Sequence, residues 1–260
     1  PVRCSKWITR TKVLLLPLPA MTRRIAILLT NDDDSAFAQA YPNDGEKFAA
    51  RLRALRPDWV YEVLSVKDGV FPPCAPAYDG YLITGSPASV NNATLPWVEP
   101  LMASIRELDR FQVPTVGLCF GHQAIAKALG GVVGHNPGGW CLGVAETDVK
   151  HAEGWMQPEK SHLNLFAAHN EQVLTPPAQA RVLSQSDFCP VGSFAVGQHF
   201  FTSQYHPEIS RQFMTDLLVY LDGKLDAALI AQARSQVNNP LDDELMFRWI
   251  VQFLEMPRTA

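Results

Sequence analysis

The chain has 260 residues, of which 47% are hydrophobic and 18% charged, and its formal net charge at pH 7 is −4. This composition is typical of a soluble globular protein with a substantial core, and the small negative charge gives no indication of nucleic-acid binding. No apolar run approaches the roughly 18 residues that span a bilayer, which argues against a membrane protein.

Residues 1–20 differ in character from the chain that follows. Basic residues precede the apolar run from Val13 to Ala20, and the two prolines in this run make it a poor signal peptide. Met21 opens a segment typical of the first buried strand of an α/β enzyme. We predict that residues 1–20 are a non-native or disordered extension and that residues 21–260 form a single domain. A signal peptide and a genuine N-terminal element are the alternatives.

Strands and helices alternate through the first half of the chain. The helix predicted at 44–55 should turn Phe48, Leu52 and Leu55 inward. The first strand, at 25–29, is continuously apolar, as a sheet buried on both faces requires. We therefore predict an α/β fold with a doubly wound, mostly parallel, flavodoxin-like open sheet and helices on both faces. The further strands are predicted at 59–66, 78–84 and 113–118, and a second helix at 97–110.

The loop from Asn31 to Ser35 contains three consecutive aspartates. Such a run could indicate a metal site, but a solvated loop that caps the next helix is the favoured interpretation. The histidines are scattered without the spacing of metal ligands. We therefore expect no metal and no other cofactor.

The second half of the chain is expected to extend the sheet with antiparallel strands. Residues 131–140 are rich in glycine and predict turns. Short strand candidates follow at 144–150, 162–168, 182–186, 194–196 and 200–204, and helices are predicted at 210–220, 225–236 and 242–253.

Residues 222–260 are interpreted as a C-terminal helical extension. Their apolar side chains are expected to form a packing surface, and a homodimer contact is the alternative use for them. These side chains are Leu241, Leu245, Phe247, Trp249, Ile250 and Phe253.

The cysteines are odd in number, irregular in spacing and without a CxxC pair. This usage argues against a disulfide framework and for a reducing compartment, so a cytoplasmic protein is predicted. The five are Cys4, Cys74, Cys119, Cys141 and Cys189.

Cys119 stands at the centre of a strand–turn–helix pattern. The apolar run 113–118 precedes it, and the helix-forming stretch that follows ends at Gly130 and Gly131. Such a turn holds a nucleophile above the edge of the sheet, and the helix N-terminus favours the reactive thiolate. The alternative is a small buried cysteine without a chemical role.

A second group of polar residues ends the strand candidate at 200–204. His206 follows this strand, and Glu208 stands two residues further on. The histidine could act as general base for Cys119, and the glutamate could orient the imidazole. Nucleophile, base and orienting carboxylate together indicate covalent acyl transfer.

Three segments, in this order along the chain, resemble the class I, triad-type glutamine amidotransferase family. They are Tyr81 to Val90, Gly117 to Gln123 and Tyr205 to Glu208. The resemblance covers about residues 22–221 and is to the amidotransferase part of GMP synthetase in particular. No phosphate-binding loop or second catalytic domain is visible in the sequence. The resemblance therefore implies a stand-alone amidotransferase domain.

The resemblance also implies a role for each catalytic residue. Cys119 would attack the γ-carbonyl of glutamine, His206 would transfer protons, and Glu208 would hold the imidazole.

The oxyanion would be bound by backbone N–H groups, one from Phe120 and one from the loop at Gly85 and Ser86. Ser86 stands where the family usually has glycine, which is a departure from the pattern.

The substrate's amino-acid end is assigned by the resemblance to two segments. Gln123, one helical turn after Cys119, would contact it. The segment that contains His169, Asn170 and Gln172 would close over it, although an ordinary turn is an alternative for this segment.

The favoured function is hydrolysis of glutamine to glutamate and ammonia, with the ammonia passed to a separate acceptor or synthetase. Hydrolysis of another γ-glutamyl amide or peptide is the first alternative, and a non-enzymatic regulatory or binding protein is the second. The expected partners are a small-molecule substrate and, where ammonia is passed on, a synthetase chain.

Overall fold

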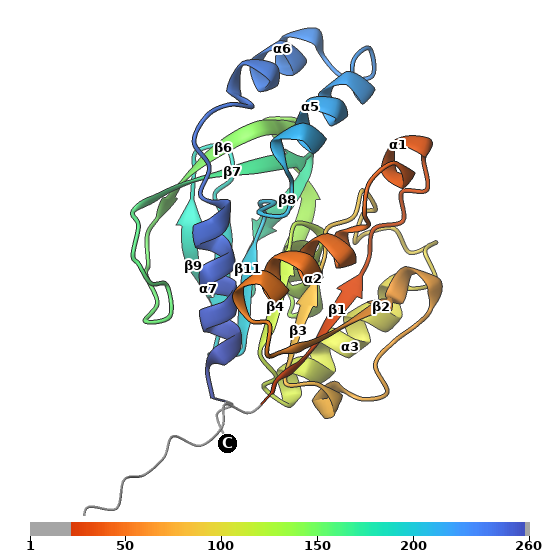
Figure 1. Cartoon of the computed structure of the whole chain (residues 1–260), viewed down its shortest axis with the longest axis vertical. Coiled ribbons are helices and arrows are strands. Elements are labelled where there is room, and N and C mark those ends of the chain that lie inside the picture. Colours follow the sequence, from red (N-terminus) through yellow and green to blue (C-terminus); the bar gives the residue numbers. More distant parts are fainter. Residues whose placement is uncertain (1–21, 258–260) are drawn as a thin grey trace, which may run out of the picture.

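The structure is a computed structural model that describes residues 22–257, and the prediction made for residues 1–20 lies outside this range. A nine-stranded sheet forms the centre of the molecule and has helices on both faces (Figure 1). Among the helices of the described range, none is both long enough and apolar enough to span a bilayer.

The strands and helices follow the predicted alternation. The strands are β1 Arg24–Leu29, β2 Val60–Ser65, β3 Gly80–Ile83, β4 Thr115–Leu118, β5 Val132–His135, β6 Cys141–Val149, β7 His162–His169, β8 Glu171–Thr175, β9 Ala180–Gln185, β10 Ser193–Val196 and β11 Phe200–Ser203. The helices are α1 Ala36–Gln39, α2 Asp44–Leu55, α3 Val98–Arg110, α4 Phe120–Ala128, α5 Arg211–Tyr220, α6 Ala227–Gln236 and α7 Asp243–Glu255.

The central sheet has the strand order β2-β1-β3-β4-β11-β10-β9-β6-β7. Its first five strands are parallel, in the 2-1-3-4-5 order of flavodoxin-like folds. From β11 onward each neighbour is antiparallel. The predicted α/β sheet with an antiparallel extension is confirmed. One assignment changes: the strand expected at 200–204 belongs to the parallel part, because the β10–β11 hairpin brings β11 alongside β4.

Successive residues of β1 supply two separate cores. Ile25 and Ile27 point into a cluster that includes α2 and α7, whereas Ala26 and Leu28 point into a cluster that includes α3 and α4. All four side chains are fully buried. This explains why the strand is continuously apolar instead of alternating with polar residues.

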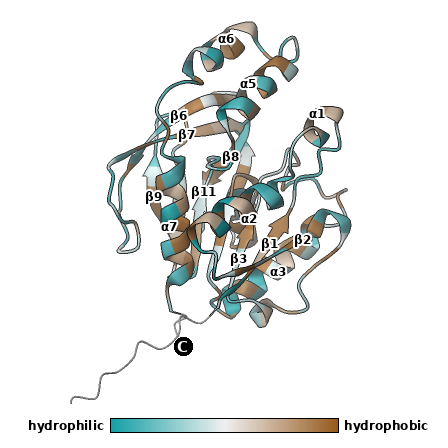
Figure 2. Cartoon of the chain, in the orientation of Figure 1, coloured by the Kyte–Doolittle hydropathy of each residue, from teal (hydrophilic) through white to brown (hydrophobic). Residues whose placement is uncertain are grey.

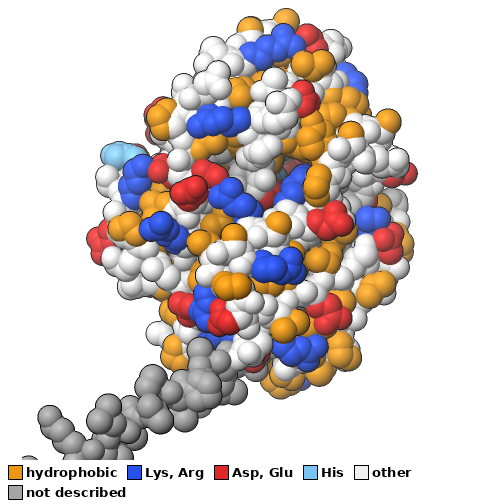
Figure 3. Space-filling view, viewed as in Figure 1, with side chains coloured by type: hydrophobic (Ala, Val, Ile, Leu, Met, Phe, Trp, Pro, Cys, Tyr) orange, Lys and Arg blue, Asp and Glu red, His pale blue; other side chains and the backbone are white. Residues whose placement is uncertain are grey.

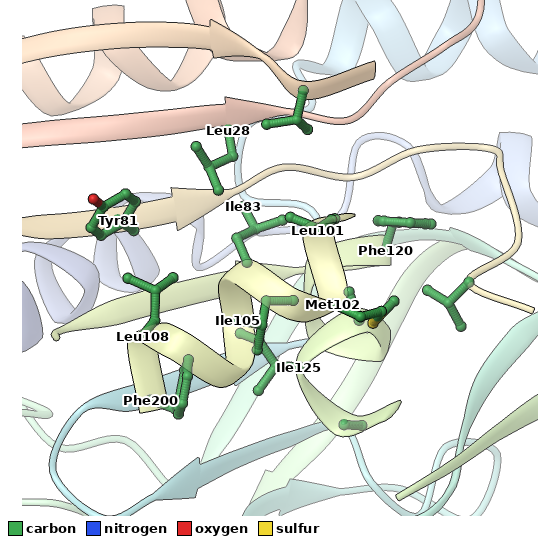
Figure 4. Packing of buried hydrophobic residues seen from close by; sticks show 14 of the residues in the cluster. Leu28, Tyr81, Ile83, Leu101, Met102, Ile105, Leu108, Phe120, Ile125 and Phe200 are labelled. Carbon is green, nitrogen blue, oxygen red and sulfur yellow. The ribbon is translucent and has the colours of Figure 1, made fainter. Parts of the chain in front are cut away.

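The α3 side of the sheet forms one of these cores. Figure 4 shows Leu28 and Ile83 of the sheet close to Leu101 and Ile105 of α3, and all four are fully buried. In Figure 2 the central strands are brown, and teal residues alternate with brown ones along the covering helices. Each helix therefore turns an apolar face toward the sheet.

Helix α7 covers the opposite face of the sheet beside α2. Phe247, Trp249, Ile250 and Phe253 are 0–1% exposed, and the ring of Phe247 lies 5.8 Å from that of Phe48 in α2. The predicted packing role of these side chains is confirmed. Because they are buried within the chain itself, they do not offer a surface to a second copy.

Two details differ from the predictions. Leu55 is 41% exposed because the last turn of α2 lies beside β2, the strand at the edge of the described sheet. The glycine-rich segment 131–140 contains the strand β5, which pairs antiparallel with β8 in a second, two-stranded sheet. The glycine-rich composition predicted turns and gave no indication of a strand. The strand forms because β8, about forty residues later in the chain, pairs with it.

Candidate active site

Cys119 occupies a sharp turn between β4 and α4. Its φ of 49° is positive, which non-glycine residues rarely adopt. A Cβ at Gly117 would lie 2.5 Å from Ile125 Cδ1, and a Cβ at Gly121 would lie 2.4 Å from the carbonyl oxygen of Ile83. The strand can turn into the helix here only because these two neighbours have no side chain.

Backbone contacts hold Cys119 at the end of its strand. Its N–H donates to the carbonyl of Ser203 at 2.8 Å, and its own carbonyl accepts from the N–H of Gln123 at 3.1 Å. The residue is 5% exposed, and α4 begins immediately after it. Cys119 therefore lies at the positive end of a helix dipole, as the sequence predicts.

His206 and Glu208 lie next to Cys119. His206 Nδ1 is 2.7 Å from Glu208 Oε1, and both side chains are buried. A Cβ built on Gly85 would lie 3.0 Å from His206 Cε1 and 3.5 Å from Cys119 Cβ, so imidazole and cysteine meet at the same glycine. The N–H of His206 donates to the carbonyl of Phe166 in β7 at 2.8 Å, which anchors this segment.

The charge of His206 is set by these neighbours. Burial by itself lowers the pKa of the imidazole, but attraction to the Cys119 sulfur and to the Glu208 carboxylate outweighs burial and holds the pKa of His206 well above its ordinary value. The two neighbours therefore favour the protonated form of the imidazole. A cationic imidazole beside the sulfur is the environment in which a cysteine is nucleophilic.

The loop after β3 is held in place through the carbonyl oxygen of Gly85. The carbonyl oxygen of Gly85 lies 3.0 Å from the hydroxyl of Thr30 and 3.2 Å from that of Thr84. Because a trans peptide points its C=O and N–H in opposite directions, the N–H of Ser86 points away from these hydroxyls. The N–H of Phe120 has no partner within α4, since Phe120 is the first residue of that helix.

The side chain of Ser86 ties this loop to the acidic loop 31–35. Its hydroxyl donates to Asp32 Oδ1 at 3.1 Å and accepts from the N–H of Ala88 at 3.1 Å. The serine that replaces the expected glycine therefore has a definite role in holding the loop. Asp32 is a residue that the sequence analysis did not single out.

The candidate substrate-binding residues divide into two groups. Gln123, His169 and Asn170 line the same cavity as Cys119. Gln172 does not: it follows Glu171 in β8, so its side chain points to the other face of the strand and lines a separate cavity of about 230 Å³. Glu171 takes its place at the cavity that contains Cys119.

His169 is held in one orientation. Its Nδ1 lies 3.1 Å from the carbonyl oxygen of Glu171, so Nδ1–H donates to that oxygen. Burial, reinforced by repulsion from His206, lowers the pKa of His169 to about 4. His169 is therefore neutral at physiological pH and offers the cavity a polar, uncharged side chain.

The cavity at Cys119 has a volume of about 820 Å³. Aromatic side chains of α1 and α5 form part of its wall. The ring centroid of Phe37 lies 4.8 Å from that of Tyr220, on which it stacks, and 5.3 Å from that of Phe213. In Figure 3 hydrophobic side chains gather where α5 and α1 face each other. The cavity thus combines the polar Cys119 region with an apolar wall.

Side chains of the acidic loop 31–35 accept hydrogen bonds from nearby backbone N–H groups. Asp33 accepts from the N–H of Ser35, and Ser35 in turn caps α1 by accepting from the N–H of Ala38. The preferred interpretation as a loop and helix cap is confirmed. Within residues 22–257, no cluster of three or more His, Cys, Asp or Glu side chains could hold a metal ion.

Gln204 is a site residue that the sequence analysis missed. It is fully buried, and its Nε2 donates to Cys119 Sγ at 3.7 Å. The sequence offered one indication of its role, namely its position immediately after β11 and two residues before His206. A lone glutamine at a strand end is too common to stand out without the contact.

The chain is similar to several known proteins. A family model described as Glutamine amidotransferase class-I matches residues 55–218. Gamma-glutamyl peptidase 3 of Arabidopsis thaliana is 26% identical over 239 residues, which cover 87% of this chain and 94% of that protein. The glutamine-hydrolyzing GMP synthase of Aeropyrum pernix is 31% identical over 134 residues, or 52% of this chain and 25% of that protein.

Solved structures share the fold. The crystal structure of a glutamine amidotransferase from Thermotoga maritima matches with a TM-score of 0.72. The match covers 90% of this chain and 99% of that one at 16% sequence identity. The α/β architecture therefore extends over almost the whole described chain.

Proposed function

Because the chain belongs to the class I glutamine amidotransferase family, we propose that it hydrolyses the side-chain amide of a γ-glutamyl compound through a thioester on Cys119. The observation that carries this proposal is the meeting of Cys119 with His206, which is itself bound to Glu208, at the wall of a large cavity.

The reaction begins with attack of the Cys119 thiolate on the γ-carbonyl carbon. The N–H groups of Ser86 and Phe120 bind the oxygen as it becomes negative. The imidazolium of His206 then gives its proton to the departing nitrogen, the C–N bond breaks, and a γ-glutamyl thioester remains on the sulfur.

Hydrolysis of the thioester completes the cycle. His206, now neutral, accepts a proton from water, whose oxygen attacks the thioester carbonyl. The C–S bond breaks, the γ-glutamyl group leaves with a free carboxylate, and the thiolate and imidazolium are restored. Glu208 keeps the imidazole in one orientation throughout, since its carboxylate accepts from Nδ1–H.

The size of the cavity favours a substrate whose amine half is larger than ammonia. Cavities of about 300–1,000 Å³ suit ligands much larger than glutamine, and the cavity at Cys119 is about 820 Å³. Similarity to a gamma-glutamyl peptidase over most of both chains supports the same choice. We therefore propose a γ-glutamyl peptide or γ-glutamyl amine as the substrate.

Glutamine is the second candidate substrate. Similarity to a glutamine-hydrolyzing GMP synthase favours it, although the chain matches only a quarter of that protein's length. In this case ammonia would pass to a separate synthetase chain or acceptor.

The test is release of glutamate from three substrates: glutamine, a γ-glutamyl dipeptide and a γ-glutamyl alkylamine. We expect the dipeptide or the alkylamine to be hydrolysed faster than glutamine, and Cys119→Ala to abolish release from all of them. Cys189→Ala, at another buried cysteine, is the matched control and should retain activity. Unchanged activity of Cys119→Ala would reject the proposed nucleophile, and exclusive turnover of glutamine would favour the amidotransferase assignment.

A further inference from the structure

The side chain of Gln204 faces the sulfur of Cys119. We propose that Gln204 is a positioning residue, whose amide N–H donates a hydrogen bond to the nucleophilic sulfur and stabilises it as a thiolate. This inference rests on the role of Cys119 in the proposed function. The contact itself is the 3.7 Å approach of Gln204 Nε2 to Cys119 Sγ, between two buried residues.

The topology of the sheet brings these two residues together. Strands β11 and β4 are parallel neighbours, and Ser203 pairs with Leu118 in their register. Gln204, the first residue after β11, therefore lies beside Cys119, the first residue after β4. The bond from the Cys119 N–H to the Ser203 carbonyl locks this register at the place where both side chains leave the sheet.

A chain of hydrogen bonds determines which way the Gln204 amide points. The carbonyl oxygen of Glu171 can only accept, so the group of Gln123 that lies 2.8 Å from it must be the donor Nε2. The same Nε2 lies 3.2 Å from the Gln204 side chain, which must therefore present its oxygen. The other end of the Gln204 amide, its NH₂, is then the group that faces Cys119.

This direction matters because the reverse amide would place a partial negative charge against the sulfur. A hydrogen bond to a charged acceptor is stronger than one to a neutral acceptor, so the donor favours the thiolate over the thiol. The ionisable groups that interact electrostatically with Cys119 include His206 and Cys189. Glu208 and His169 act on His206 in turn. Gln204 approaches the sulfur as a neutral donor.

The same bond acts again when the thioester is hydrolysed. Formation of the thioester removes the negative charge from sulfur and weakens the bond. As water attacks and the C–S bond breaks, the electron pair returns to sulfur, and the N–H of Gln204 is already in place to stabilise it. The chain through Gln123 also links the nucleophile to the turn between β7 and β8, which lines the cavity.

The test is the pH dependence of Cys119 alkylation by iodoacetamide, followed by mass spectrometry of the Cys119 peptide. In this reaction the thiolate forms a C–S bond and iodide leaves, so the rate follows the thiolate fraction. Gln204→Met keeps the length of the side chain without a donor. We expect alkylation to become about tenfold slower at neutral pH and to recover to the wild-type plateau at alkaline pH.

Ser203→Ala is the matched control, because Ser203 is equally buried and adjacent, and its hydroxyl contacts the N–H of Tyr205 and not the sulfur. Its alkylation profile should superimpose on that of the wild type. If Gln204→Met fails to fold, Gln204→Asn, which withdraws the amide from the sulfur, tests the same shift of the profile to higher pH.

Two outcomes would overturn the inference. An unchanged profile for Gln204→Met would show that the donor is not needed. A rate lowered by the same factor at every pH would show a role in packing alone. Alkylation needs no substrate, so a wrong substrate assignment leaves this test intact. Equal reactivity of Cys119 and the buried Cys189 at neutral pH would instead contradict the proposed nucleophile.

Discussion

Gly85 shows how little space surrounds Cys119 and His206. Its carbonyl is held near the hydroxyls of Thr30 and Thr84, and its Cα faces both His206 and Cys119. A Cβ at this position would lie 3.0 Å from the imidazole, which is closer than an ordinary van der Waals contact. The absence of a side chain at Gly85 therefore leaves room for the imidazole of His206 beside Cys119.

Gly85→Ala tests this contact. We expect the new methyl group to displace the imidazole by a fraction of an ångström or more and to lower kcat/KM by about 100-fold, since small misplacements of catalytic groups are that costly. Steady-state kinetics on the γ-glutamyl substrate proposed above measure the change. Gly154→Ala is the control, because a Cβ there has no atom within 4 Å. Wild-type kinetics for Gly85→Ala would show that the site tolerates the methyl group.

Single residues differ in how far the sequence predicted their place. Cys119, His206 and Glu208 were predicted and do meet, because each follows a parallel strand and all such ends lie at one edge of the sheet. Gln172 was predicted at the site and is absent from it, because strand alternation turns Glu171 toward the cavity instead. Gln204 was missed, because its contact with Cys119 arises from the β4–β11 pairing.

Helix α7 completes the hydrophobic core on the α2 side of the sheet. Its side chains contact both the sheet and the loop after β6. The ring centroid of Phe253 lies 5.8 Å from that of Phe201 in β11 and 5.2 Å from that of Trp155 in the loop. Phe201 lies on the strand that leads to Gln204 and His206. The C-terminal helix therefore supports the strand on which half of the site depends.

Phe253→Ala measures that support. Removing a fully buried aromatic ring is expected to lower the free energy of unfolding by about 3–5 kcal/mol, because the cavity left behind is only partly refilled. Urea denaturation of both proteins measures the difference. Val219→Ala on α5, where the side chain is 63% exposed, should change it by less than about 0.5 kcal/mol. A small effect of Phe253→Ala would mean that α7 adds little to the core.

Elements were predicted best where they carry their own signal. The long helices have an apolar face and recognisable ends: Asn43 and Glu46 form a capping box at the start of α2, and Ser210 caps α5. The strands β5 and β8 have no such signal, because each is short and stable only against the other. Local pattern decides the first kind of element, and tertiary pairing decides the second.

Buried histidines make the stability of the whole molecule depend on pH. Burial lowers the pKa of His122 to about 3 and that of His169 to about 4, and repulsion from a neighbouring histidine acts in the same direction. Once unfolded, both bind protons as the pH falls below about 6.5. Acid therefore favours the unfolded chain, and stability is lost as pH falls from about 6.5 toward about 4.

His206 contributes with the opposite sign. Its pKa is raised in the folded protein, so its protonated form stabilises the fold at low pH, and that contribution is lost as pH rises through the raised value. Between about pH 6.5 and pH 4 His122 and His169 therefore contribute to the loss of stability. His122 is the simpler one to change because it lies outside the cavity lining.

His122→Gln is expected to reduce the fall in melting temperature between about pH 6.5 and pH 4, because one group that can be protonated only in the unfolded state is removed. Circular dichroism melts across this range measure the slope. His151→Gln, at an exposed histidine, is the control and should keep the wild-type slope. An unchanged slope in His122→Gln would mean that other groups cause the acid sensitivity.

The sequence by itself determined the class of fold and singled out Cys119, His206 and Glu208 as the residues proposed to react, because both depend on local pattern. Continuous apolar strands alternating with amphipathic helices specify a parallel sheet, and a cysteine between two glycines specifies a sharp turn. Only the tertiary structure decided which polar side chains surround the sulfur. That choice depends on which strands become neighbours and in what register, and it places Gln204 beside Cys119 and Gln172 on the other face of its strand.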